Sequence, residues 1–247
     1  MNQSEHPKED ENMIEVRDLW KVYGKGEKRV EALKGVDLFI DRGEFLVILG
    51  PSGSGKTTLL NCLSGVDSPT RGEIFFDGVA FHSLNEEKKT EFRAKRMGFV
   101  FQFFNLVPVL TALENVELPL KILGMKHHEA RRRALEMLEK VGLSSKIYRF
   151  PSELSGGEQQ RVAIARALVH EPDVVWGDEP TGNLDSETGL SVIELLENMR
   201  FQHGTTMVIV THDERIACRA DRVLTIRDGK IVKEERKSEA LQDKFSR

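Results

Sequence analysis

A glycine-rich loop carries the residue types and spacing needed to bind phosphate groups. It reads Gly50-Pro51-Ser52-Gly53-Ser54-Gly55-Lys56-Thr57, and Thr58 follows. Because glycine has no side chain, successive backbone N–H groups of such a loop can face phosphate oxygens. Lys56 is suited to bridge β- and γ-phosphates, and the Thr57 hydroxyl to coordinate Mg²⁺. The alternative is an ordinary Gly/Ser turn, but the apolar run before the loop and the helical pattern after it favour phosphate binding.

Two adjacent carboxylates, Asp178 and Glu179, follow the apolar run 174–177. At the end of a strand, the first carboxylate can serve a metal ion through water, and the second can accept a proton from an attacking water. We therefore expect Asp178 to serve Mg²⁺ and Glu179 to act as general base. Taken alone, the pair is equally consistent with a solvated turn.

His212 follows another apolar run, 208–211, within the sequence Thr211-His212-Asp213. An imidazole at this point can donate a hydrogen bond to a γ-phosphate or organise the attacking water. A lone histidine at a strand end is more often structural. Its position downstream of the glycine loop and the acidic pair favours a role in catalysis.

The elements that position these groups follow from the residue pattern. β-branched and aromatic residues cluster between glycines and charged turns, which predicts strands over 14–23, 32–40, 45–49 and 73–76. A helix over 56–64 follows the glycine loop. From Glu158 onward we expect a helix, a strand over 174–178, a helix over about 186–202, a strand over 207–211 and a short β segment. Apolar strands that alternate with helices predict an α/β fold with a mainly parallel sheet.

The middle of the chain changes to a helical pattern. Thr111 and Glu114 form a possible capping box, and apolar residues recur at helical spacing over 130–141. We place a helical subdomain at about 103–157. The basic run 131–133 is interpreted as a solvated helix face without assigned function. The whole forms a single domain over 13–236, between a disordered tail at 1–12 and a charged tail at 237–247.

Composition limits the classes of partner. The chain has 36 basic and 40 acidic residues and a net charge of −4, so it lacks the broad basic field of general nucleic-acid binding, and no direct nucleic-acid partner is expected. No apolar run approaches the ~18 residues that span a bilayer, and 1–12 carries no secretory pattern, which predicts a cytoplasmic protein. Cys62 and Cys218 lack metal-site spacing and are expected to be reduced thiols.

Further motifs make a family resemblance specific. Residues 154–161 read Leu-Ser-Gly-Gly-Glu-Gln-Gln-Arg, and Asn183-Leu184-Asp185 follows the acidic pair. With the glycine loop, Gln102 and His212 in the same order, the chain resembles the nucleotide-binding subunit of ABC transporters over about 14–232. Residues 154–161 match the signature, Gln102 the Q-loop, 183–185 the D-loop and His212 the switch histidine. The resemblance implies an ATPase with the P-loop NTPase fold, an N-terminal antiparallel β subdomain, a helical subdomain, and the cofactors ATP and Mg²⁺.

The resemblance also implies that ATP is held between two copies of the chain, the glycine loop of one facing the signature of the other. Ser155 and the Gly157 N–H would hold the γ-phosphate; capping of the following helix uses the same donors and is compatible with this role. The implied nucleotide-binding residues are Tyr23, Gly50, Pro51, Ser52, Gly53, Ser54, Gly55, Lys56, Thr57, Thr58, Ser155, Gly156, Gly157, Glu158 and Asp185.

Roles for individual residues follow from the same resemblance. Tyr23 corresponds to the aromatic that stacks on adenine, although a strand aromatic can instead belong to the core. Gln102 senses Mg²⁺ or the attacking water and links ATP binding to the helical subdomain. The implied metal-binding residues are Thr57, Gln102 and Asp178, and the implied catalytic residues are Lys56, Gln102, Glu179 and His212.

A separate transmembrane permease is the second implied partner. In this family a short coupling helix of the permease enters a groove beside the Q-loop. Phenylalanines at 99, 101, 103 and 104 surround Gln102; simple core packing accounts for some of them, and one or two are expected to line that groove. Three positions depart from the family pattern: Glu158, Phe103 and Trp176, the last of which puts the packing of its strand in doubt.

Residues 101–106, 113–120 and 178–186 resemble one subgroup, the ATPases of macrolide-export, lipoprotein-release and related systems. This resemblance implies export or extraction of a lipophilic, peptide or lipoprotein cargo from a position on the cytoplasmic face of the membrane. One alternative is an ATPase that regulates a membrane complex, of cell-division or signalling type, without moving a solute. Another is a soluble ABC ATPase of DNA repair or translation, whose long coiled-coil insertion or second cassette is absent from this sequence.

Overall fold

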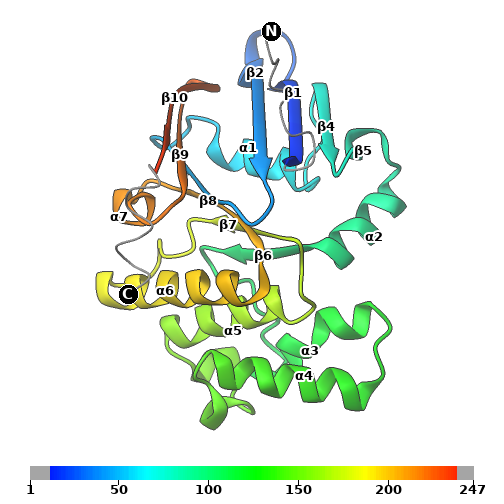
Figure 1. Cartoon of the computed structure of the whole chain (residues 1–247), viewed down its shortest axis with the longest axis vertical. Coiled ribbons are helices and arrows are strands. Elements are labelled where there is room, and N and C mark those ends of the chain that lie inside the picture. Colours follow the sequence, from blue (N-terminus) through cyan, green and yellow to red (C-terminus); the bar gives the residue numbers. More distant parts are fainter. Residues whose placement is uncertain (1–11, 238–247) are drawn as a thin grey trace, which may run out of the picture.

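The computed structural model describes residues 12–237, which form a central sheet, a smaller antiparallel sheet and a set of helices (Figure 1). The central sheet has the strand order β10-β9-β3-β8-β7-β6. Its strands are β3 (Phe45–Leu49), β6 (Met97–Phe101), β7 (Val174–Asp178), β8 (Thr206–Thr211), β9 (Arg222–Arg227) and β10 (Lys230–Arg236). All pairings are parallel except that of β10 with β9. The predicted α/β fold with a mainly parallel sheet is confirmed.

The N-terminal sheet is antiparallel and has the order β2-β1-β4-β5. Its strands are β1 (Asn12–Tyr23), β2 (Val30–Asp41), β4 (Arg71–Phe76) and β5 (Val79–Ala80). The predicted strands 14–23, 32–40 and 73–76 lie within two residues of β1, β2 and β4 at both ends. Asn12 begins β1 and does not belong to a tail, whereas the rest of the expected tails, 1–11 and 238–247, lies outside the described residues.

Seven α-helices occur in the described part of the chain. They are α1 (Lys56–Leu63), α2 (Glu86–Arg96), α3 (Ala112–Ile122), α4 (His127–Lys140), α5 (Gly156–Leu168), α6 (Ser186–His203) and α7 (Glu214–Ala217). Short 3₁₀ turns cover Gly26–Lys28, Phe81–Ser83, Ser144–Lys146 and Pro151–Glu153. Helices α3 and α4 form the lobe farthest from the antiparallel sheet in Figure 1. The predicted capping box of Thr111 and Glu114 at the start of α3 is confirmed.

Alternate residues of the central strands enter two different cores. In β3, Phe45 and Val47 pack with the helices α3 to α6, whereas Leu46 and Ile48 pack with α1 and the antiparallel sheet. This follows from the two-residue period of a strand, whose side chains point to opposite faces in turn. The central sheet is therefore covered by α1 on one face and by α5 and α6 on the other.

Trp176 fills the core beneath the antiparallel sheet. It is 1% exposed, and its ring meets Phe76 edge to face at 6.4 Å between ring centres. The next residue must be small, because a Cβ on Gly177 would lie 3.0 Å from Cγ1 of Ile209. Trp176 and Gly177 thus pack on opposite faces of β7. Trp176 is therefore compatible with the packing of its strand, which the sequence had put in doubt.

Sequence analysis did not identify α2. Its sequence, EEKKTEFRAKR, is charged around nearly the whole helix, so it lacks an apolar stripe. Its end signals are nevertheless present: the Asn85 side chain accepts a hydrogen bond from the N–H of Lys88, with acidic residues in the first turn and basic residues in the last.

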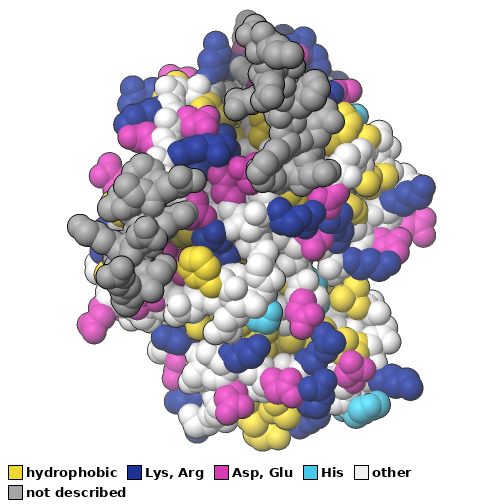
Figure 2. Space-filling view, in the orientation of Figure 1, with side chains coloured by type: hydrophobic (Ala, Val, Ile, Leu, Met, Phe, Trp, Pro, Cys, Tyr) yellow, Lys and Arg dark blue, Asp and Glu magenta, His cyan; other side chains and the backbone are white. Residues whose placement is uncertain are grey.

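The surface carries interspersed charges. On the face shown in Figure 2, Lys and Arg alternate with Asp and Glu over the helices, without an extended area of one sign. Within residues 12–237, no helix combines the length and the hydropathy that crossing a membrane requires.

Candidate active site

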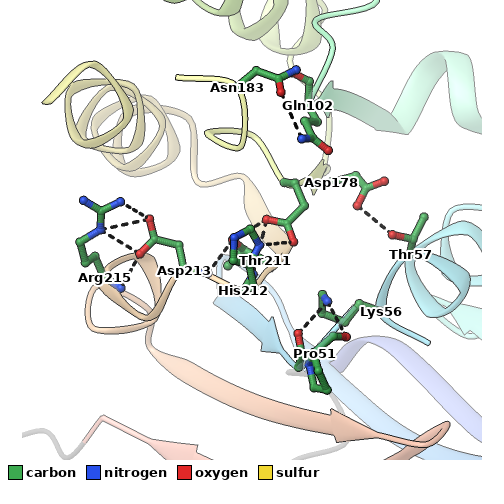
Figure 3. Close-up of polar contacts among 12 residues, drawn as sticks. Pro51, Lys56, Thr57, Gln102, Asp178, Asn183, Thr211, His212, Asp213 and Arg215 are labelled. Carbon is green, nitrogen blue, oxygen red and sulfur yellow. Dashed lines mark hydrogen bonds and ion pairs between the residues drawn. The ribbon is translucent and has the colours of Figure 1, made fainter. Parts of the chain in front are cut away.

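The groups expected to act on phosphate converge where three parallel strands end. Leu49 of β3 pairs with Thr211 of β8, and Val210 of β8 pairs with Asp178 of β7. The carboxyl ends of parallel strands meet at one edge of a sheet, so the glycine loop, the acidic pair and His212 leave the sheet together (Figure 3). Register alone therefore assembles these motifs.

The glycine loop wraps closely around the start of α1. Gly55 has a φ of +106°, and a Cβ at this position would lie 2.6 Å from the carbonyl oxygen of Ala32, so both conformation and space require glycine. The ammonium group of Lys56 donates to the carbonyl oxygens of Gly50 (2.7 Å) and Pro51 (3.1 Å). The loop borders a cavity of about 390 Å³. Since glycine offers no side-chain cap, the first N–H groups of α1 are available for a phosphate there.

Thr57 and Asp178 lie side by side across this edge (Figure 3). Thr57 Oγ1 donates to Asp178 Oδ1 over 3.0 Å. Burial raises the pKa of the Asp178 carboxyl above its ordinary value; the hydrogen bond from Thr57 opposes the rise, and the charge of Glu179 adds to it. A hydroxyl and a carboxylate oxygen at this separation are the hard donors that Mg²⁺ prefers. The residues present therefore fit that ion.

Glu179 is held in an unusual backbone conformation. Its φ is +46°, and its N–H donates to the carbonyl oxygen of Val210 over 2.9 Å. The carboxylate accepts a hydrogen bond from Thr211 Oγ1 (2.9 Å) on one oxygen, and His212 Nδ1 lies 2.9 Å from the other. A hydrogen bond from His212 to an ionised carboxylate across this contact requires the tautomer with the proton on Nδ1. Glu179 is thus a well-oriented carboxylate beside an exposed imidazole.

Gln102 directly follows β6 and contacts the D-loop. Its Nε2 donates to Asn183 Oδ1 (3.2 Å), and Asn183 Nδ2 donates to the Gln102 carbonyl oxygen (3.0 Å). A Cβ on Gly182 would lie 2.9 Å from Gln102 Nε2. Behind this pair, the fully buried side chain of Gln160 donates to the carbonyl oxygen of Pro180. The Q-loop, the D-loop and helix α5 are therefore linked by amide hydrogen bonds.

The signature residues form the start of α5. Ser155 Oγ accepts from the Glu158 N–H, and Glu158 Oε2 accepts from the Ser155 N–H, a complete capping box. The bond from the Ser155 N–H lowers the pKa of the Glu158 carboxyl. A Cβ on Gly157 would lie 2.5 Å from Thr188 Cγ2, so close packing on α6 requires glycine.

Helix α5 and the glycine-loop helix α1 contact different cores, on opposite faces of the central sheet. Across residues 12–237, no hydrogen bond or ion pair joins residues 155–158 to the loop at 50–57. One chain therefore does not bring these two motifs to one site.

Tyr23 and Asp185 occupy different settings. Tyr23 ends β1, is 40% exposed and pairs with Val30, which lines the cavity, so the Tyr23 and Val30 side chains lie on the same face of the sheet. Asp185 is the N-cap of α6 and accepts from the N–H groups of Glu187 and Thr188. The bonds from Thr188 and then Glu187 lower the pKa of the Asp185 carboxyl. Asp185 thus caps a helix, which leaves its role toward nucleotide a prediction.

Sequence reasoning missed three residues that support the site. Thr211 orients Glu179, Gln160 links α5 to the strand ends, and Asp67 accepts a hydrogen bond from the hydroxyl of Tyr23. Two of them stand inside recognised motifs: Thr211 directly precedes His212, and Gln160 lies in the signature segment. Only Asp67 has no local signal, because its partner lies 44 residues away.

A groove of about 470 Å³ opens beside the Q-loop, between α2, β6, α3 and α5. Phe99 and Phe101 line it with stacked rings 5.9 Å apart, whereas Phe103 is 72% exposed and lies outside it. The charged and titratable lining residues are Arg93, Arg166 and His170. Two of the four phenylalanines thus line this groove; its role as the permease groove stays a prediction.

Comparison with known proteins gives concordant matches. The family model described as ABC transporter matches residues 33–182. The lipoprotein-releasing system ATP-binding protein LolD of Legionella pneumophila (strain Paris) is 50% identical over 217 residues, 88% of this chain and 96% of that protein. The uncharacterized ABC transporter ATP-binding protein YbbA of Escherichia coli (strain K12) is 47% identical over 224 residues, which cover 91% and 98% of the two chains.

Among solved structures, the chain is similar to the ATP-binding cassette MJ0796, determined as a dimer in a post-hydrolysis state with bound ADP and Pi. The TM-score is 0.84 at 45% identity, over 91% of this chain and 98% of that one.

The contact between Thr211 and Glu179 predicts a specific effect on turnover. Thr211→Val keeps the shape of the side chain but removes the hydroxyl that donates to Glu179 and accepts from the Asp213 N–H. The maximal rate of ATP hydrolysis should therefore fall about tenfold while ATP affinity stays unchanged. Steady-state kinetics would measure both. Thr206→Val is the matched control, because Thr206 is equally buried at the opposite end of β8 and bonds Gly43 instead. Equal rates for the two variants would contradict the assigned role of Thr211.

Proposed function

Because the chain belongs to the ABC transporter family and forms its ATP-binding cassette, we propose that it drives a separate permease that exports or extracts a lipophilic, peptide or lipoprotein cargo. The chain is an ATPase. The lipoprotein-releasing relative, identical at half of the aligned positions, supports this cargo class. The proposal also places the protein on the cytoplasmic face of the membrane, held there by the permease.

Nucleotide binding is assigned to the cavity above the glycine loop. The N–H groups at the start of α1 and the ammonium of Lys56 bind the β- and γ-phosphates, and Lys56 exchanges its bonds to Gly50 and Pro51 for phosphate oxygens. The ring of Tyr23 stacks on adenine. Thr57, Gln102 and, through water, Asp178 would hold Mg²⁺, which would neutralise charge on the phosphates.

Hydrolysis is assigned to the groups around Glu179. The Glu179 carboxylate accepts a proton from the attacking water, while Thr211 and His212 fix its two oxygens. His212 is 70% exposed, so its Nε2 side is accessible to the γ-phosphate. The bonds of Gln102 to Asn183 connect the site to the D-loop and, through the Q-loop, to the helical lobe.

The observation that carries the proposal is the placement of α1 and α5 on opposite faces of the central sheet. Ser155 is exposed and Gly157 half-buried at the start of α5, and within residues 12–237 no hydrogen bond joins either residue to the phosphate-binding loop. A second copy related by two-fold symmetry supplies that loop, so two copies form two equivalent sites. ATP closes this dimer, hydrolysis and product release reopen it, and the motion is transmitted to the permease.

Glu179→Gln tests the proposed base and the proposed dimer together. The amide cannot take the proton, so hydrolysis should fall by at least about 100-fold while ATP binding is retained and an ATP-dependent dimer accumulates. Phosphate release and light scattering after gel filtration would measure these outcomes. Glu136→Gln, an exposed change on α4, should behave as wild type. Normal turnover in Glu179→Gln would exclude Glu179 as the base.

The groove beside the Q-loop is the proposed docking site of the permease. Its aromatic and aliphatic lining adjoins Gln102 through β6, so a helix seated there is mechanically connected to the nucleotide site. Arg93 and Arg166 at the groove favour a docking helix that carries carboxylates.

Ile122→Asp tests this docking site. Ile122 lines the groove and is 67% exposed, so the change should spare folding and ATP binding yet abolish stimulation of the ATPase by a permease that co-purifies with the protein. Phe201→Asp, on α6 and 74% exposed, is the control and should remain stimulated. Stimulation that survives in Ile122→Asp would contradict the docking site, and a cargo-release assay on the same complex would separate transport from regulation without transport.

A further inference from the structure

The side chain of Tyr23 is fixed by a charged pair that no nucleotide-binding motif includes. Its hydroxyl donates to Asp67 Oδ2 over 2.8 Å, and the other oxygen of Asp67 accepts from the ammonium of Lys21 over 2.6 Å. Lys21 also donates to the carbonyl oxygen of Ser68 and lies 4.8 Å from the centre of the Tyr23 ring. Tyr23, Lys21 and Asp67 thus contact one another in all three pairs.

This cluster is partly protected from water. The Lys21 side chain is only 12% exposed, and that of Asp67 is 32% exposed. Burial, together with the hydrogen bond to Asp67, raises the pKa of the Tyr23 hydroxyl, so it remains a donor. Although burial acts in the other direction, the contacts of Lys21 and Tyr23 keep the pKa of Asp67 below its ordinary value. The Tyr23 hydroxyl therefore remains a donor and the Asp67 carboxylate an acceptor at neutral pH.

Asp67 is itself fixed to helix α1. Its N–H donates to the carbonyl oxygen of Asn61 in the last turn of α1, and its side chain also accepts from the N–H of Ser68. The first turn of α1 faces the phosphate cavity, and its last turn binds Asp67. The carboxylate of Asp67 in turn binds the hydroxyl of Tyr23. This sets the position of the ring relative to the phosphate-binding loop.

The ring is oriented but not covered. Tyr23 remains 40% exposed although its hydroxyl is bonded. The ammonium of Lys21 lies over one face of the ring, which leaves the opposite face for a planar partner. A free tyrosine at the end of a strand would lose rotamer freedom on stacking, whereas a ring already held in place loses little.

We propose that Asp67, supported by Lys21, is a positioning residue for the nucleotide base: it holds the Tyr23 ring at a fixed distance from the phosphate loop, so that adenine stacks on a pre-ordered surface. The inference rests on the proposed role of Tyr23 in binding adenine. Asp67 does not touch the nucleotide and acts only through Tyr23.

The test compares ATP with a ligand that has no base. Tyr23→Phe removes the hydroxyl but keeps the ring, and Asp67→Ala removes its acceptor. Each should raise the Kd of MgATP about two- to tenfold, the cost of ordering one side chain, and leave the Kd of magnesium tripolyphosphate unchanged. The double variant Tyr23→Phe/Asp67→Ala should bind ATP no more weakly than the weaker single variant. Both changes remove the same hydrogen bond, the one between the Tyr23 hydroxyl and Asp67.

Two controls keep the outcomes distinct. Tyr148→Phe, which removes another exposed hydroxyl that accepts from an arginine in the helical lobe, should bind both ligands as wild type. Tyr23→Ala tests the stacking itself: wild-type ATP affinity in this variant would overturn the role of Tyr23.

If Tyr23→Ala weakens ATP but Tyr23→Phe and Asp67→Ala do not, the positioning role of Asp67 is wrong and stacking stands. The inference is equally overturned if Asp67→Ala weakens tripolyphosphate as much as ATP, since Asp67 would then act on α1 or on the fold and not on the ring.

Discussion

The parallel pairing of β3, β8 and β7 is the constraint on which the site depends. Leu49 lies opposite Thr211, and Val210 lies opposite Asp178, so three loops that are far apart in sequence leave the sheet at one level. A shift of one residue in either pairing would turn side chains to the other face of the sheet. It would also separate Asp178 from Thr57. The buried apolar residues that fix this register therefore also fix the distance between the acidic pair and the glycine loop.

The same sheet accounts for the division of the site between two molecules. Its two faces are covered by different helices, with α1 and the glycine loop on one side and α5 with the signature on the other. The first turn of each helix offers backbone donors suited to phosphate. Since α1 and α5 do not meet in one chain, each molecule carries two half-sites, one at the glycine loop and one at the signature. A second copy related by two-fold symmetry supplies the missing half of each site.

Much of this arrangement could be predicted from the sequence, because it rests on local patterns. The glycine loop, the apolar strands and the capping boxes each lie within a few adjacent residues, and the order of motifs identified the family. Helix α2 was missed because its charged surface has no apolar stripe. Asp67 was missed because only the fold brings it to Tyr23, and the link of Gln160 to Pro180 likewise depends on tertiary contacts. Asp67, which lies outside every motif and 44 residues from its partner, has no local sequence signal.

The central claim, that each chain carries halves of two sites, is tested most directly by mixing two inactive variants. Lys56→Ala disables the glycine loop, and Ser155→Glu places a negative charge where the signature would meet phosphate. If the sites form between chains, mixed dimers contain one intact site, and an equimolar mixture should recover about a quarter of the wild-type ATPase rate, since half of the dimers are mixed. A mixture no more active than either variant alone would contradict the account.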